Sequence, residues 1–129
     1  MKDKAPAIAG GILGLAFITF GLNHFLNFLP TPPGPPEGSP PAMFFGALIT
    51  TGYFGFIKTI EILGGILVAI PKTRNIGLLA LGPVVVNILA FQVFMTGGAG
   101  LTQAPVILVS TLSAYLLWSA RGKFAGLLN

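Results

Sequence analysis

The sequence predicts an all-α, polytopic membrane protein in which four transmembrane helices form a single bundle with both termini in the cytoplasm. Three observations carry this prediction. The 129 residues are 53% hydrophobic and 8% charged, with a mean hydropathy of +0.87, whereas a soluble domain has about 25% charged residues. Four apolar segments are long enough to cross a bilayer, and the basic residues gather on one side of them. The length allows one domain, residues 1–129.

The expected spans cover about residues 6–28, 43–70, 76–95 and 104–120. They are expected to be helices because the backbone groups of an open strand would stay unpaired in lipid. The segments also lack the alternation of polar and apolar residues found in barrel strands. A cleaved signal peptide over residues 1–28 is disfavoured, since its apolar run exceeds the usual length of about 7–15 residues. The proline-rich outer loop, residues 29–42, favours an extended conformation. It is interpreted as a spacer or, alternatively, as a docking strip for an extracytoplasmic partner.

The basic residues predict the orientation. Six of the seven fall before the first span, between the second and third, or after the fourth: Lys2, Lys4, Lys72, Arg74, Arg121 and Lys123. With four spans these segments share one side, which the positive-inside rule makes cytoplasmic. This distribution also explains the basic pI without nucleic acid.

The sequence lacks the residues that several kinds of functional site require. The chain has no cysteine, one histidine and three acids, so thiolate sites are excluded and no metal site is expected. Neither a phosphate-binding loop nor a dinucleotide fingerprint is present, and no basic–aromatic patch of nucleic-acid type occurs.

Glycines recur at helical spacing in two of the expected spans. Gly10, Gly14 and Gly21 form a stripe in the first, and Gly64 and Gly65 lie in the second. Small residues let helices approach closely in lipid. The stripes predict packing inside the bundle in preference to a dimer interface.

Polar residues within the second span predict an intramembrane network. Counted from the inner end, Lys58 is about 18 Å deep and Glu61 about 13 Å deep, on one helix face. An ion pair facing the bundle is expected because a lone charge there is costly. Asn87 and Ser110 reach a similar depth in the third and fourth spans. The four residues either lock the helix register or form a proton-handling or ligand site, and both interpretations remain open.

A second polar cluster is expected nearer the outer surface. Asn23 and His24 end the first span about 26–32 Å from the inner side, Tyr53 is at similar height, and Gln92 is about 24 Å up the third span. An imidazole beside phenylalanines would suit a quinone headgroup. The alternative is an interfacial histidine with the rings facing lipid.

The sequence resembles the DoxX-like family of small four-helix membrane proteins over roughly residues 10–121. The residues that carry the resemblance are Gly21-Leu22-Asn23-His24-Phe25, Glu61-Ile62-Leu63-Gly64-Gly65 and the basic turn Pro71-Lys72-Thr73-Arg74. It implies a plasma (inner) membrane protein of a prokaryote, in some relatives the membrane subunit of thiosulfate:quinone oxidoreductase. It also implies that Glu61 is the family's second-helix acid and that His24 marks the polar end of the first helix. Because this chain has no cysteine, a partner would have to carry thiosulfate chemistry.

These observations support two hypotheses of different classes. The first is a DoxX-like subunit that binds a quinone or another lipophilic ligand, or anchors a redox partner; as an enzyme it would be at most the membrane subunit of a quinone-linked oxidoreductase. The second is a structural or assembly subunit of a larger membrane complex without a ligand. Expected partners are membrane lipid, a redox or assembly protein, or further copies of the chain. A small transporter is disfavoured because four short spans leave little room for a pathway.

Overall fold

The protein is described here by a computed structural model that covers residues 4–30 and 34–128. In this part of the chain all regular elements are helical, as the sequence predicts. The α-helices are α1 (Lys4–Leu26), α2 (Pro40–Thr50), α3 (Tyr53–Ala69), α4 (Arg74–Phe94), α5 (Ala104–Ser119) and α6 (Arg121–Ala125). Short 3-10 helices are η1 (Pro71–Thr73), η2 (Ala99–Thr102) and η3 (Gly126–Leu128). Lys2, Asp3 and residues 31–33 of the proline-rich loop lie outside the described residues.

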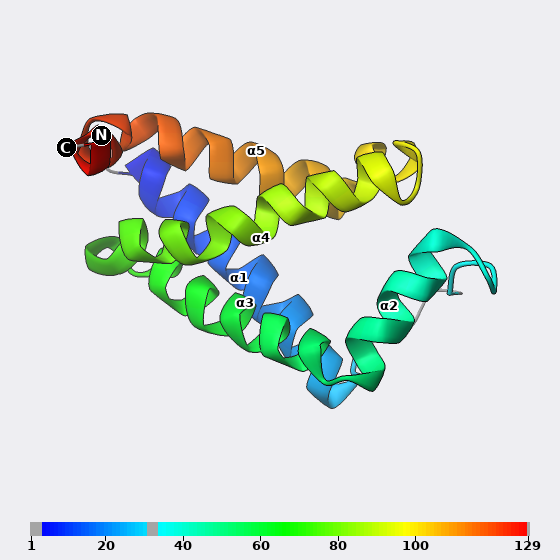
Figure 1. Cartoon of the computed structure of the whole chain (residues 1–129). Coiled ribbons are helices and arrows are strands. Elements are labelled where there is room, and N and C mark those ends of the chain that lie inside the picture. Colours follow the sequence, from blue (N-terminus) through cyan, green and yellow to red (C-terminus); the bar gives the residue numbers. More distant parts are fainter. Residues whose placement is uncertain (1–3, 31–33, 129) are drawn as a thin grey trace.

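Helices α1, α3, α4 and α5 form the bundle (Figure 1). Both α1 and α4 pack against α3 and against α5, so each helix of the bundle has two neighbours. The centre is filled by Leu13, Val68, Leu81 and Leu116, whose side chains are fully buried. The start of α1 and the end of α5 lie at the same end of the bundle.

Glycines set the distance between neighbouring helices, as the stripes predict. A Cβ at Gly14 would meet the backbone oxygen of Gly65, and one at Gly10 would lie 2.7 Å from the oxygen of Val68. On the other side of α3, a Cβ at Gly64 would lie 2.8 Å from the Leu81 side chain. Side chains at these positions would push the helices apart, so α1 and α4 both pack closely against α3.

The second expected span, about residues 43–70, is divided into two helices. An 83° bend separates α2 from α3. The hydroxyl of Thr51 donates to the Ala47 oxygen at 2.7 Å, and Gly52 has a φ of +79° that favours glycine. A continuous helix over this range is therefore wrong, because the Thr51–Gly52 corner ends α2 and turns the chain. Figure 1 shows α2 diverging from the bundle.

Within residues 4–30 and 34–128, two helical segments are long and apolar enough to cross a membrane: Lys4–Leu26 and Pro71–Phe94. A third candidate requires the bent pair of α2 and α3 to count as one span. Helix α5 is apolar but has 16 residues. The exterior is also apolar, since side chains such as Leu15, Val86 and Phe94 are exposed. Long apolar helices with an apolar exterior indicate a membrane protein.

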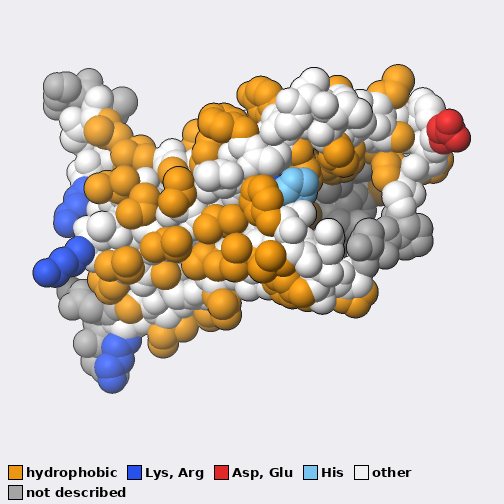
Figure 2. Space-filling model, turned by 90° about the horizontal axis from the view of Figure 1, so that it is seen from below, with side chains coloured by type: hydrophobic (Ala, Val, Ile, Leu, Met, Phe, Trp, Pro, Cys, Tyr) orange, Lys and Arg blue, Asp and Glu red, His pale blue; other side chains and the backbone are white. Residues whose placement is uncertain are grey.

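Apart from Lys58 and Glu61 of α3, the charged side chains of the described residues gather at the ends of the molecule. Figure 2 shows lysine and arginine side chains at one end, an acidic side chain at the other, and hydrophobic side chains between them. The described residues that supply the basic end are Lys4, Lys72, Arg74, Arg121 and Lys123. An apolar belt between polar ends matches the layers of a bilayer.

Candidate functional site

Lys58 and Glu61 form the expected ion pair within α3. The Lys58 Nζ donates to Glu61 Oε1 at 3.3 Å, and the two side chains are 17% and 7% exposed. Glu61 shares the buried face of α3 with Gly64, Gly65 and Val68. Its carboxylate therefore belongs to the interior of the bundle. A buried charge pair is a poor source of stability compared with apolar packing, so this pair is a candidate for function.

The Phe54 ring connects this pair to the histidine on α1. Lys58 Nζ lies 5.0 Å from the centre of the ring, in a cation–π arrangement. The His24 imidazole lies 5.0 Å from the same ring and 4.9 Å from the Phe25 ring, edge-on to both. His24, expected in the outer cluster, thus lies beside the same ring as Lys58 of the expected inner network.

His24 lies nearer to Lys58 along the bundle than residue counting places it, because α1 and α3 are staggered. Counting residues from each inner end assumes that the first two spans begin at the same level. In the structure Gly10 packs against Val68 and Gly14 against Gly65, so the first turns of α1 extend beyond the end of α3. This stagger lowers His24 to the level of Gly55, where a Cβ would lie 3.9 Å from its Nε2.

Asn87 and Ser110 bond within their own helices. Asn87 Nδ2 donates to the Pro83 oxygen at 2.7 Å, and Ser110 Oγ donates to the Val106 oxygen. In the described part of the chain no hydrogen bond joins either residue to Lys58 or Glu61. Such bonds to the preceding helical turn compete with long-range partners, so the network expected from depth reduces to the ion pair.

Three of the four expected ligand residues lie apart from a common site. Asn23 Oδ1 accepts a hydrogen bond from the Leu29 amide at 2.8 Å and holds the turn after α1. Tyr53 is 57% exposed, and its ring is edge-on to Phe56. Gln92 is buried, but its Oε1 accepts from the Thr96 hydroxyl at 3.0 Å. The structure therefore places His24 with Lys58, and the other three elsewhere.

Gln92 instead lines a groove between α2, the proline-rich loop and the end of α4, at the end of the bundle opposite the basic residues (Figure 2). The groove has a volume of about 480 Å³. Its described lining is Pro35, Pro36, Pro41, Phe45, Phe91, Gln92, Thr96, Ala99, Gly100 and Gln103. It is the place where the proline-rich loop and polar side chains meet. A signal for it in the sequence is the group Gln92, Thr96 and Gln103 around the glycine-rich turn.

A row of aromatic rings leads from the histidine to this groove. Phe45 is edge-on to Phe54 at 5.7 Å and lies 5.1 Å from Phe91, and Phe44 lies 5.4 Å from Phe91. These contacts attach α2 to α3 and α4. Sequence reasoning did not identify Phe91, which offers no signal beyond its position next to Gln92.

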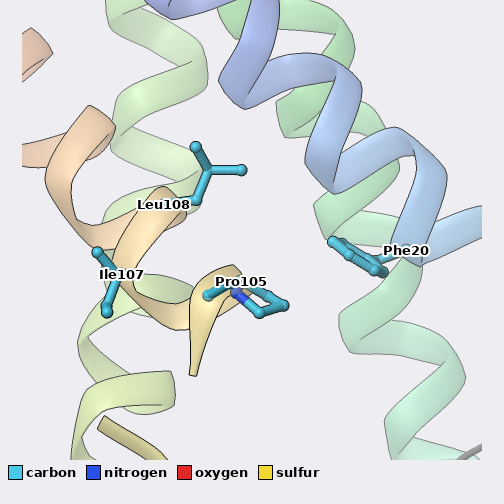
Figure 3. A pocket seen from close by; sticks show the side chains of 5 residues that line it. Phe20, Pro105, Ile107 and Leu108 are labelled. Atoms are coloured by element: carbon cyan, nitrogen blue, oxygen red, sulfur yellow. The ribbon is translucent and has the colours of Figure 1, made fainter. Parts of the chain in front are cut away.

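A second groove lies between α1 and α5, with a volume of about 500 Å³. In Figure 3, Phe20 of α1 is across a gap from Pro105 and Leu108 of α5. Ala104 and Ile107 complete its lining, so every lining side chain is apolar. It has no group that could orient a polar ligand.

No protein-family model matches the chain, and no match to it was found among curated proteins or among solved structures. The class of protein that the structure itself defines is a small helical bundle with an apolar exterior and a buried charged pair.

Proposed function

We propose that the protein is a DoxX-like integral membrane subunit that binds a quinone or a similar lipophilic ligand at His24 and Lys58. In this proposal four spans cross the plasma membrane of a prokaryote, with both termini cytoplasmic. The observation that carries the proposal is the placement of two polar donors around one aromatic ring inside an apolar belt. A polar group at this depth is costly and marks a functional site by default.

The donors are available for a ligand. In the described part of the chain the His24 imidazole has no hydrogen-bond partner, and Lys58 donates only to Glu61. An ammonium group has three donors, so Lys58 retains others. A carbonyl oxygen accepts from either group, while Phe25 and Phe54 offer apolar walls to a ring. Glu61 then positions Lys58 and balances its charge.

A second candidate function is a structural or assembly subunit that anchors a protein partner. The groove beneath the proline-rich loop favours it, because prolines and amide side chains line the same surface. Proline-rich surfaces with accessible polar groups suit an extended segment of a partner. Such a partner would bind at the outer end of the bundle, away from Lys58.

The test is mass spectrometry of the protein extracted gently with its own lipids, read for small molecules and for co-purifying chains. We expect a stoichiometric quinone in the unaltered protein and its loss in His24→Phe. This variant keeps an aromatic ring against Phe25 and Phe54 but removes both nitrogen atoms. Tyr53→Phe is the matched control, since it removes an exposed polar group at the neighbouring helix end.

Equal quinone content in the unaltered protein and in His24→Phe would contradict the ligand site. A stoichiometric protein partner without quinone would favour the assembly function. That partner should then be released by substitutions in the groove, such as Gln103→Ala, and retained in His24→Phe.

A further inference from the structure

The basic end of the bundle carries more positive charge than its described neighbours balance. Lys4, Lys72, Arg74, Arg121 and Lys123 gather there (Figure 2). The described acids lie elsewhere: Glu37 is in the outer loop, and Glu61 is paired with Lys58 inside the bundle. The third acid, Asp3, lies outside the described residues. This end therefore attracts anions.

The two arginines at this end differ in their contacts. Arg121 Nη1 donates to the Trp118 oxygen at 2.8 Å, and its guanidinium lies 4.1 Å from the Trp118 ring centre. Arg74 has no hydrogen bond or ion pair within the described residues, and its Nε is buried without a partner. A buried N–H without a partner is costly, so among the described residues Arg74 is the arginine whose side chain is left without a partner.

Packing holds the Arg74 side chain at the junction of three helices. A Cβ at Gly10 of α1 would lie 3.1 Å from Arg74 Nε and 2.7 Å from the Val68 oxygen of α3. Arg74 itself is the first residue of α4. Gly10 thus provides the space in which the guanidinium lies. A cation at the first turn of a helix is repelled by the helix dipole, which an anion beside it would offset.

We propose that Arg74, assisted by Lys72, binds the phosphate of an anionic phospholipid at the inner edge of the membrane. A guanidinium forms paired hydrogen bonds with phosphate oxygens, and the terminal nitrogens of Arg74 are not among the buried atoms. Lys72 is exposed two residues earlier in η1. A lipid is the occupant because the apolar exterior of the bundle adjoins its basic end (Figure 2), and acyl chains can lie along it.

The inference rests on the membrane setting of the proposed function but not on its quinone site. The test is native mass spectrometry of the full chain in detergent micelles, titrated with phosphatidylglycerol or phosphatidylcholine. We expect the unaltered protein to bind phosphatidylglycerol in preference to phosphatidylcholine. In Arg74→Gln the affinity for phosphatidylglycerol should fall about tenfold, the effect of losing one charge-assisted hydrogen-bonded contact. Arg74→Lys keeps the charge but loses the paired geometry, so an intermediate loss is expected. Arg121→Gln is the matched control, with the same change in charge and an expected effect below about twofold.

The proposal would be overturned if Arg74→Gln and Arg121→Gln weakened binding equally, because that would show an effect of net charge alone. Equal binding of the two lipids by the unaltered protein would also overturn it. So would full displacement of phosphatidylglycerol by millimolar inorganic phosphate, which would show a site for free phosphate. Thermal unfolding of each variant verifies that the bundle is intact, and Arg74→Lys supplies the test if Arg74→Gln does not fold. His24→Phe separates the two proposals, because it should retain lipid binding whether or not it loses quinone.

Discussion

The imidazole of His24 and the ammonium group of Lys58 lie at the same distance, 5.0 Å, from the centre of one phenylalanine ring, although they belong to different helices. Their proximity follows from the stagger of α1 against α3. That stagger is set where Gly14 meets Gly65 and Gly10 meets Val68. Close glycine packing in the first half of α1 thus determines which polar groups meet at its second half.

Removing one partner of the ion pair should be more harmful than removing both. Glu61→Leu leaves the ammonium of Lys58, whose side chain is only 17% exposed, without its partner, so we expect a loss of up to about 3 kcal/mol in the free energy of unfolding. The double variant Lys58→Met/Glu61→Leu should recover most of that loss, because apolar packing replaces two desolvated charges. Unfolding of the detergent-solubilised protein by denaturant measures both. A double variant as unstable as the single one would show that the pair stabilises the bundle in its own right.

The contact between α1 and α3 should tolerate no side chain at Gly14. Gly14→Ala places a methyl group against the Gly65 oxygen and the Ala69 side chain, and overpacking of this kind costs about 1–3 kcal/mol. Gly11→Ala is the control in the same helix, since nothing lies within 4 Å of a Cβ there. It should be neutral or stabilising by up to about 1 kcal/mol, because alanine favours the helix. The melting temperatures of the two variants measure this difference. Equal values would contradict the close approach of α1 to α3 at Gly14.

Aromatic contacts should hold α2 against the end of α4. Phe91→Ala removes the ring that Phe44 and Phe45 contact, so α2 should become mobile. Because the chain has no cysteine, spin labels can be placed at Ala47→Cys and Val93→Cys. Their distance distribution should broaden in Phe91→Ala and remain narrow in Phe94→Ala, whose ring is 80% exposed in the unaltered protein. An unchanged distribution in Phe91→Ala would show that the Thr51–Gly52 corner alone positions α2.

Cysteine labelling should also reveal the topology of the proposed four spans. In intact cells we expect a membrane-impermeant thiol reagent to modify Glu37→Cys, in the outer loop, and to leave Lys123→Cys unmodified until the membrane is opened. The reason is that four spans place the basic ends inside. Labelling of both positions in intact cells would place them on the same side, so the chain would cross the membrane an even number of times between them instead of three times. Such a result would assign α2 and α3, or the short α5, to a re-entrant segment.

Much of this architecture follows from composition and spacing. Runs of apolar residues predict helices, and the pair Lys58 and Glu61 at positions three apart must share a helix face. Glycine stripes predict close packing, which the contacts of Gly10, Gly14 and Gly64 confirm. The sequence does not reveal the corner at Thr51 and Gly52, because an apolar run that contains several glycines is equally compatible with a continuous helix. Only the hydrogen bonds of Thr51 and the positive φ of Gly52 distinguish the two.

The candidate site was less predictable, for a physical reason. The order of the residues determines which side chains share a face of one helix, because the helical period is constant. It therefore determines the ion pair and the glycine stripes. Contacts between helices depend on how far the helices are shifted along their axes. They also depend on whether each polar group finds a hydrogen-bond partner within its own helix or turn. Only the tertiary structure places His24 and Lys58 beside the same ring. It also shows that Asn23 and Gln92 form hydrogen bonds within their own local turns, and that Arg74 lies beside Gly10 without a described partner.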